Sequence, residues 1–284
     1  MKRPLDRAAL DTHPLPQVTN GDKESKGRIL VIAGSRAVPG AALLCATAAM
    51  RAGAGKLRIA TVQSVAPRVG VLMPEAMVVA LPEEGDGGFA ERTAKPIAEQ
   101  AASVDAVVAG PGVKHNDACA AIATALIESN AALALDVGIL KALKPPTTRR
   151  QPLPVLLPDT DELASLLDCG EDEIARDPLG CGIRAADRYS SVVLVKGPVS
   201  HVVAPDGDVW TFESGVPGLG VSGSGDVLAG IVGGLLARGA EPLNALLWAV
   251  WLHGRAGAAL MRKVGPIGFL AREIADEVPA LMLG

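Results

Sequence analysis

Large apolar residues recur on one side of a helix predicted to begin near residue 224. They occupy positions 227, 228, 231, 232, 235 and 236, the spacing of a helix that buries one face. Gly239 lies where such a helix is expected to stop. The glycine-rich stretch 218–234 therefore runs from a loop straight into this helix, and Gly223, Ser224 and Gly225 are predicted to form its first turn.

Short apolar, β-branched runs alternate with helical patterns along most of the chain. Strands are predicted at 28–33, 56–62, 77–81, 104–109, 132–136, 155–157 and 191–196. Helices are predicted at 41–51, 117–129, 163–167 and 243–261. The runs 200–204 and 208–212 indicate a β-hairpin, because Asp206-Gly207 supplies the positive φ of a tight turn. Residues 1–27, broken by three prolines, are predicted to be an extended or helical lead-in.

This alternation predicts an α/β fold with a mainly parallel central sheet and helices on both faces, in one domain over 1–284. Ligands bind such sheets beyond the carboxyl ends of the strands. Several candidate residues directly follow predicted strands, namely Gly34, Gly110–Gly112, Asp136, Asp159 and Lys196. One shared crevice is therefore expected at this edge of the sheet.

The junction at residues 223–226 is the first candidate for chemistry. The leading amides of a helix have no partner within the helix and lie at the positive end of its dipole, so they can bind an anion. Asp226 in the first turn gains roughly 0.3–1 kcal/mol from that dipole, so it is expected to be ionised at neutral pH. It is suited to take a proton from a hydroxyl that attacks a bound phosphate. The alternative is that Asp226 only stabilises the helix start.

The loop 34–40 is a second candidate, because small residues again precede a helix. It forms either another ligand-binding edge or a plain turn. Residues 218–223 match the dinucleotide fingerprint G-x-G-x-x-G, but no second strand with an acidic ribose ligand follows at the required distance. A phosphate-binding Walker loop is excluded, because Gly55-Lys56 is followed by Leu57.

Composition narrows the class of protein. The 284 residues are 49% hydrophobic and carry a formal net charge of −4, which gives no basic field for nucleic acid. No unbroken apolar stretch is long enough to cross a membrane, and the basic N-terminus lacks a following apolar region. We therefore expect a cytoplasmic protein with no nucleic-acid or membrane partner.

The cysteines and histidines indicate no metal centre built by the protein. The four cysteines, at 45, 119, 169 and 181, lack C-x-x-C spacing and are expected to be buried thiols. The four histidines, at 13, 115, 201 and 253, form no cluster in the sequence. Trp248 and Trp251 are expected to pack in the core rather than stack on a ligand.

A series of motifs in this order resembles the NAD(P)H-hydrate dehydratase family, a branch of the ribokinase-like superfamily. The motifs are Gly34-Ser35 with 39–42, Gly110-Pro111-Gly112, Lys196-Gly197, Gly218-Leu219, 223–230 and Leu252-His253-Gly254. The resemblance implies a ribokinase-like fold and an enzyme that uses ADP or ATP, with Mg²⁺, to restore hydrated NADH or NADPH. It also implies a homotetramer.

The resemblance further implies roles for individual residues. Ala42, Gly112, Asp159 and Asp226 would contact the hydrated nicotinamide nucleotide, and Asp226 would be catalytic. The adenine nucleotide would be held by Lys196, Gly197, Pro198, Val199 and Ser200 together with Gly223, Ser224 and Gly225.

The chain departs from the family pattern at three places. The usual Pro-His-Pro-Gly-Glu appears as residues 158–162, so Asp159 replaces the histidine, and Asp159 with Glu162 also has the spacing of a helix cap. Ser222 replaces a common glycine, and the stretch after Asp136 lacks a second acid or alanine. Two other functions therefore stay open: a kinase for a small alcohol such as a hydroxymethylpyrimidine or sugar, and a nucleotide-binding sensor without turnover.

Overall fold

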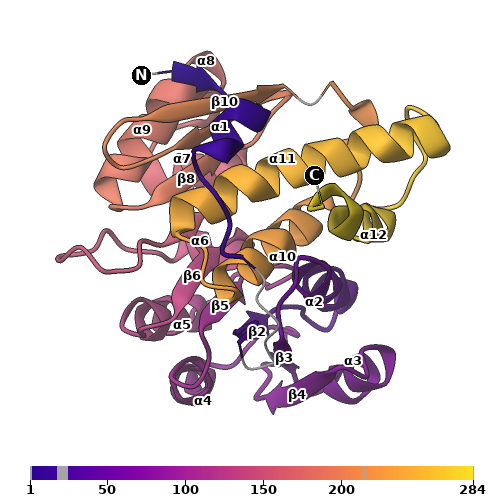
Figure 1. Ribbon diagram of the computed structural model, residues 1–284. Coiled ribbons are helices and arrows are strands. Elements are labelled where there is room, and N and C mark those ends of the chain that lie inside the picture. Colours follow the sequence, from indigo (N-terminus) through magenta and orange to yellow (C-terminus); the bar gives the residue numbers. More distant parts are fainter. Residues whose placement is uncertain (1, 18–24, 214, 284) are drawn as a thin grey trace.

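The computed structural model describes residues 2–17, 25–213 and 215–283 (Figure 1). The predicted lead-in at 1–27 is therefore described only in part, and residues 1 and 18–24 lie outside the described residues. No helix in the described ranges is long and apolar enough to span a bilayer.

Ten strands form one sheet in the order β1-β10-β9-β8-β7-β6-β5-β2-β3-β4 (Figure 1). Their bounds are β1 Lys2–Pro4, β2 Arg28–Ile32, β3 Lys56–Val62, β4 Ala76–Leu81, β5 Ala106–Ala109, β6 Ala132–Leu135, β7 Val155–Leu156, β8 Val192–Val195, β9 Val199–Val203 and β10 Val209–Glu213. The seven strands from β8 to β4 are parallel, and β9 is antiparallel to both of its neighbours. The mainly parallel sheet is confirmed.

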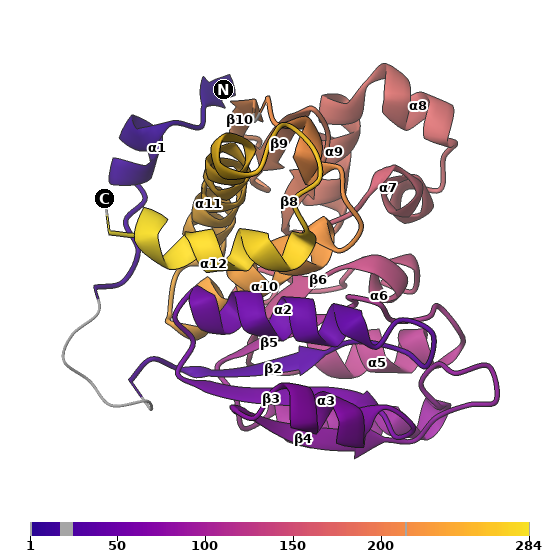
Figure 2. The same ribbon diagram turned by 90° about the vertical axis from the view of Figure 1, so that its right-hand side faces the viewer.

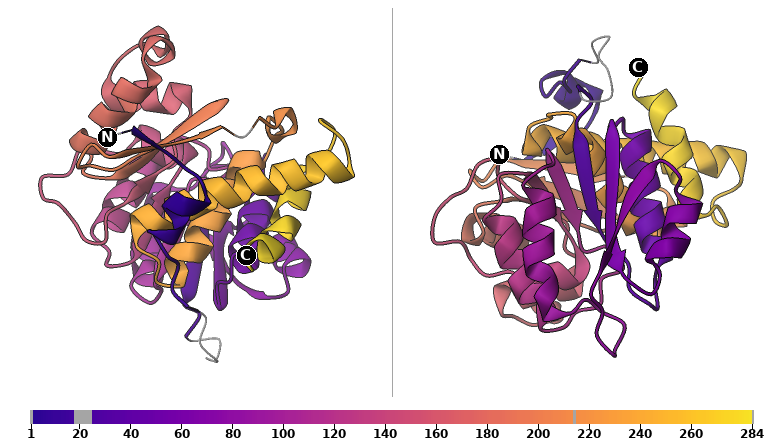
Figure 3. Two further views of the ribbon diagram at one scale, coloured as in Figure 1. Left: turned by 45° about the horizontal axis from the view of Figure 1, so that its top comes forward. Right: turned by 90° about the horizontal axis from the view of Figure 1, so that it is seen from below.

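Helices cover both faces of the sheet and make three layers (Figures 2 and 3). One face carries α2 Gly40–Arg51, α3 Ala66–Leu72, α10 Ser224–Ala237, α11 Pro242–Lys263 and α12 Ala271–Leu281. The other carries α4 Ala94–Ala101, α5 Ala118–Ile127, α6 Val137–Lys141, α7 Thr160–Leu167, α8 Glu171–Arg176 and α9 Pro178–Arg188. The 3₁₀ turns η1 Glu91–Thr93 and η2 Pro217–Leu219 complete the elements, with α1 Arg7–Asp11 against α11. Because both faces are covered, the central strands β5, β6 and β8 are buried at every position.

Glycines let α10 approach its neighbours closely. A Cβ atom at Gly230 would lie 2.2 Å from the Cys45 carbonyl oxygen on α2, and one at Gly234 would lie 2.4 Å from that of Ala49. A Cβ at Gly233 would lie 2.1 Å from a Val108 methyl on β5. The backbone of α10 therefore packs directly on the backbone of α2, and α10 lies between α2 and the sheet. This fixes where the N-terminus of α10 points.

Most predicted elements are confirmed, with bounds that shift by at most three residues. The helix predicted at 163–167 begins at Thr160, because Asp159 caps it. The predicted hairpin is present as β9 and β10, and Gly239 (φ 86°) ends α10 as expected. The apolar pattern of the sequence did not predict the helices α3, α4, α6, α8, α9 and α12.

The N-terminal segment is more ordered than a plain lead-in. β1 pairs in parallel with β10 at the edge of the sheet, and the Trp248 indole Nε1 donates to the His13 carbonyl over 2.8 Å. Trp248 is buried as expected, whereas Trp251 is only half-buried and lies beside the guanidinium groups of Arg7 and Arg255. The cysteines are buried except Cys169, which is half-buried, so that part of the prediction is wrong.

The close approach of α10 to α2 predicts a loss of stability on adding one methyl group. Gly230→Ala places that methyl against the Cys45 carbonyl and should lower the free energy of unfolding by about 1–3 kcal/mol, measured by urea denaturation. Gly40→Ala is the matched control, because Gly40 opens α2 and nothing lies within 4 Å of an added Cβ. Equal stability of Gly230→Ala and wild type would contradict this account of the packing.

Candidate active site

The first turn of α10 carries free backbone donors. Gly223 caps the helix with φ 88°, and the Val227 amide donates to the Gly223 carbonyl over 3.1 Å. Within the described residues, the amides of Gly225 and Asp226 donate to no acceptor. They lie at the positive end of a 14-residue helix, so they form a site for an anion. The predicted first turn is confirmed.

A buried ion pair lies beside this turn. Lys196, at the end of β8, places Nζ 3.1 Å from Oδ1 of Asp136, at the end of β6. The Asp136 side chain is 2% exposed and that of Lys196 is 27% exposed. Burial raises the pKa of Asp136, and the Lys196 charge partly opposes that rise. A Cβ on Gly225 would lie 4.0 Å from Lys196 Nζ, so the ammonium stands next to the free amides.

Asp226 is half-buried on the same turn, and its pKa is raised to about 6. Burial is the main cause, the negative charge of Asp136 adds to it, and Lys196 acts in the opposite direction. The expected gain from the helix dipole is therefore outweighed. Asp226 is still mostly ionised at neutral pH, as predicted, but it binds a proton more readily than an exposed carboxylate. This suits a general base.

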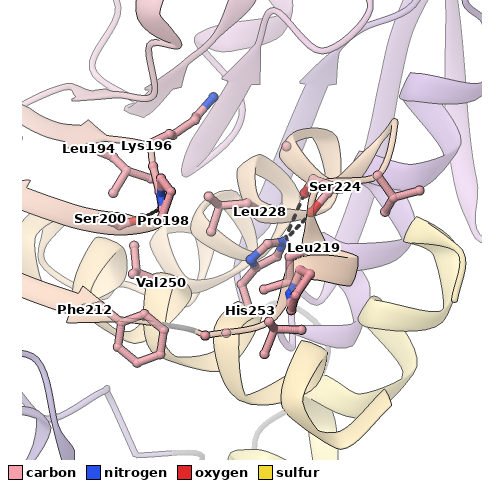
Figure 4. Close-up of a pocket in the computed structure, with 18 residues that line it drawn as sticks. Leu194, Lys196, Pro198, Ser200, Phe212, Leu219, Ser224, Leu228, Val250 and His253 are labelled. Atoms are coloured by element: carbon pink, nitrogen blue, oxygen red, sulfur yellow. Dashed lines mark hydrogen bonds between the residues drawn. The ribbon is translucent and has the colours of Figure 1, made fainter. Parts of the chain in front are cut away.

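A cavity of about 700 Å³ opens on one side of the turn. Its polar lining comes from Lys196, Gly197, Ser200, Ser224 and Gly225, among other residues. The apolar lining comes from residues on β8, β10, η2, α10 and α11, namely Leu194, Phe212, Leu219, Leu228 and Val250. Figure 4 shows Leu194, Pro198 and Ser200 facing Ser224, Leu228 and Leu219 across this space. An apolar space with anion donors at one end fits a nucleotide base with its phosphates.

His253 ties α11 to the first turn of α10. Its Nε2 lies 3.0 Å from Ser224 Oγ and 3.2 Å from the Ser224 carbonyl oxygen (Figure 4). Burial lowers the pKa of His253 to about 4, so the ring is neutral at physiological pH. His253 therefore holds Ser224 without adding a charge to the cavity.

The second candidate edge lies beyond the ends of β2 and β5. The Gly34 amide donates to the Pro111 carbonyl over 2.8 Å, and Gly34 has φ 81°. A Cβ on Gly112, at φ 64°, would lie 2.5 Å from Ala41 Cβ, and one on Gly34 would lie 3.5 Å from Ala42 Cβ. The loop at Gly34 and the loop at Gly112 therefore contact each other and the start of α2. Leu44, also on α2, packs against Gly223 at the start of α10. The structure brings this edge to the side of α10 that carries α2.

Comparison with known proteins shows which family the chain belongs to. A family model described as NAD(P)H-hydrate dehydratase matches residues 29–280. The chain belongs to the NAD(P)H-hydrate dehydratase family. An ADP-dependent (S)-NAD(P)H-hydrate dehydratase of Xanthomonas campestris is 44% identical over 99% of this chain and 96% of its own length. A bifunctional NAD(P)H-hydrate repair enzyme of Moorella thermoacetica is 33% identical, and the match covers 93% of this chain but 50% of that protein.

Solved structures agree with this membership. The ADP/ATP-dependent NAD(P)H-hydrate dehydratase of Bacillus subtilis, co-crystallised with ATP and Mg²⁺, superposes with a TM-score of 0.84 at 26% identity. The match covers 99% of this chain and 98% of that one. A ribokinase-like superfamily protein of Enterococcus faecalis shares the fold, with a TM-score of 0.82 at 22% identity, over 99% of this chain and 95% of that one. The resemblance and the ribokinase-like fold are both confirmed.

Asp159, for which the family resemblance implies a histidine, makes the helix cap that its spacing predicts. Its Oδ1 accepts from the Glu162 amide over 2.9 Å, and the Asp159 amide donates to Glu162 Oε2 over 2.9 Å. The capping box at the start of α7 is therefore confirmed. One carboxylate oxygen of Asp159 is used by the helix, and the side of Asp159 that faces solvent stays open to a ligand.

The predicted nucleotide residues do not all reach the cavity. Val199 and Gly223 are absent from its lining, and Val199 is 39% exposed on β9. From the sequence, Asp136 was expected at the shared crevice without a specific role, and His253 was noted only as part of a family motif. The only feature of the sequence that pointed to these two residues was their position, Asp136 after a strand and His253 in a motif. Only the fold shows that one reaches Lys196 and the other Ser224.

The described residues form no group of three or more His, Cys, Asp or Glu able to hold a metal ion. Mg²⁺ prefers near-octahedral oxygen ligands, keeps several waters and is commonly held by substrate phosphates. Mg²⁺ would therefore enter the site bound to the phosphates of the nucleotide substrate.

Glu162 predicts a pH-dependent stability. Burial raises its pKa to about 7, and the charge of Asp136 adds to the rise. The folded state then keeps a proton that the unfolded chain loses above about pH 4.5, so stability falls as pH rises from there through 7. Glu162→Gln keeps the acceptor for the Asp159 amide and removes the charge. It should raise the free energy of unfolding at pH 8 by about 1 kcal/mol or more, with no such gain at pH 4.

The measurement is urea denaturation at both pH values. Glu273→Gln is the matched control, because Glu273 accepts from the Leu270 amide at the start of α12 and is less buried than Glu162. A gain for Glu162→Gln that is equal at pH 4 and pH 8 would show that its charge does not matter.

Proposed function

We propose that this chain uses ADP or ATP to dehydrate hydrated NADH and NADPH, through phosphorylation of the ring hydroxyl and elimination of phosphate. One observation carries the proposal: Asp226, with its pKa near 6, stands beside the free amides of α10, between the large cavity and the glycine loops at the start of α2. The identity of 44% to the Xanthomonas dehydratase supports the same reaction.

Two ligands occupy opposite sides of that turn in this proposal. The adenine nucleotide lies in the cavity, with its base among the apolar residues. It is held there by the predicted residues that line the cavity, namely Lys196, Gly197, Pro198, Ser200, Ser224 and Gly225. The hydrated nicotinamide lies at the other edge, near Ala42, Gly112, Asp159 and Asp226. Lys196 stands at the border between them and draws the phosphates to the free amides.

Asp226 takes the proton of the ring hydroxyl as its oxygen attacks the terminal phosphorus of the nucleotide. The new oxygen–phosphorus bond forms while the bond from phosphorus to the bridging oxygen breaks and the shortened nucleotide leaves. The amides of Gly225 and Asp226 and the Lys196 ammonium stabilise the charge on the transferring group. Mg²⁺ bound to the phosphates supplies further neutralisation of that charge.

The carbon–oxygen bond of the phosphate ester then breaks, and phosphate leaves with the bonding electrons while the lone pair of the ring nitrogen forms a double bond to that carbon. Loss of a proton from the neighbouring ring carbon restores the double bond. Phosphorylation thus converts a poor leaving group into a good one. Cytoplasmic location and a homotetramer complete the proposal; both derive from the sequence and the family resemblance.

The decisive test supplies purified protein with Mg²⁺, hydrated NADH and either ADP or ATP. We expect the near-ultraviolet absorbance of the dihydronicotinamide ring to return with at least one nucleotide, and inorganic phosphate to appear in equal amount. A stable phosphorylated product from a small alcohol, with no recovery of the dinucleotide, would identify a kinase instead. Nucleotide binding without any reaction would identify a sensor.

Asp226→Asn tests the base directly. Loss of a general base should lower turnover by at least about 10²-fold while nucleotide affinity, measured by calorimetry, changes only a few-fold. Asp177→Asn is the matched control, because Asp177 caps α9 by accepting from the Gly180 amide over 2.8 Å and lies outside the site. If Asp226→Asn keeps wild-type turnover, as Asp177→Asn should, Asp226 only supports the helix start.

A further inference from the structure

Asp136 is the most deeply buried carboxylate of the site, and the reaction proposed above does not use it. Its side chain is 2% exposed at the carboxyl end of β6, in the middle of the sheet. A carboxylate in such a place costs several kcal/mol unless it is paired, and its partner is the Lys196 ammonium at 3.1 Å. Such an arrangement calls for a role that an apolar residue could not fill.

The backbone around Asp136 is held in place from two sides. A Cβ on Gly110 would lie 1.8 Å from the Asp136 carbonyl oxygen, so only glycine fits at the end of β5. Val137, the next residue, has φ 46°, a left-handed conformation that is costly for a β-branched side chain. These two features set the position of the Asp136 carboxylate relative to Lys196.

Asp136 and Asp226 act on each other although they lie on different elements. The charge of Asp136 is the second cause, after burial, of the raised pKa of Asp226. Both carboxylates also raise the pKa of the buried Cys45 thiol on α2, after burial itself. Cys45 and Lys196 therefore both lie close enough to the two acids to interact with their charges.

We propose that Asp136 is a positioning residue: it holds the Lys196 ammonium beside the first turn of α10 and places a second negative charge next to Asp226, the proposed base. This rests on the function proposed above. Without Asp136, Asp226 would lie beside an unopposed ammonium and would be a weaker base. With it, Lys196 stays in position for a phosphate while its effect on Asp226 is largely balanced.

Other groups around the two acids set the background for any titration. The charged and titratable groups near the two acids are Cys45 on α2, Asp159 and Glu162 at the start of α7, and Lys196 at the end of β8. His253 on α11 lies next to them, at Ser224 on the first turn of α10. His253 is neutral above about pH 4 and Cys45 stays protonated, so neither changes charge near pH 6. Glu162, with a pKa of about 7, titrates in the same range and is followed separately with Glu162→Gln.

The experiment is a carbon-13 NMR titration of the Asp226 carboxyl in aspartate-labelled protein, with the signal assigned by Asp226→Asn. In Asp136→Asn, the Asp226 pKa should fall by about 1 pH unit, because the neighbouring charge is gone while Lys196 keeps an acceptor. The acid limb of kcat/KM should move to lower pH by the same amount. The NMR result needs no turnover, so it stands even if the proposed reaction is wrong.

Asp105→Asn is the matched control. Asp105 pairs with Arg28 at the opposite end of the sheet and accepts from the Arg28 amide over 2.7 Å. It should leave the Asp226 titration unchanged. An unchanged Asp226 pKa in Asp136→Asn would overturn the proposal. Should that variant not fold, wild-type protein decides: coupled acids show two shared titration steps, and independent curves for Asp136 and Asp226 overturn the proposal equally.

Discussion

The structure depends on the close packing of one helix. Three glycines let α10 lie against the backbone of α2 and the middle of the sheet, at distances that no larger residue permits. Because a helix held so tightly cannot tilt or slide, its first turn has one place in the fold. That place is the carboxyl edge of the sheet, where the strand ends and the loops that follow them converge. The anion site is thus a consequence of core packing.

A small set of charges turns that site into a reactive one. Asp136, Asp226 and Glu162 each interact with the charge of Lys196, and burial raises the pKa of all three acids. One cation among three carboxylates leaves the site with an excess of acceptors, which favours proton binding near neutral pH. The incoming phosphates bring more negative charge, so the free amides and Lys196 are the groups that oppose it. In the proposed reaction, the buried acids that raise the pKa of Asp226 also lower the stability of the fold, because charged groups are costly to bury.

Asp159, where the family resemblance implies a histidine, has a structural role in this fold. The aspartate starts α7 through a reciprocal hydrogen bond with Glu162, which a histidine could not reproduce in the same way. The cost is a carboxylate at a place expected to face an anionic substrate. The chain keeps its free amides, its Lys196–Asp136 pair and its apolar cavity. Asp159 does not line that cavity, so the difference at this position leaves the cavity lining unchanged.

The sequence alone determined the alternation of strands and helices, the glycine-rich turn at 223–225 and the capping pair at 159 and 162, because each is set by neighbours within a few residues. It also carried the family motifs. Only the tertiary structure decided that Lys196 meets Asp136, sixty positions away, and that His253 meets Ser224. The pKa of Asp226 likewise depends on burial and on Asp136, so the sequence predicted the dipole's effect and missed the stronger one. Contacts and electric fields between distant segments arise from packing, and no local pattern encodes them.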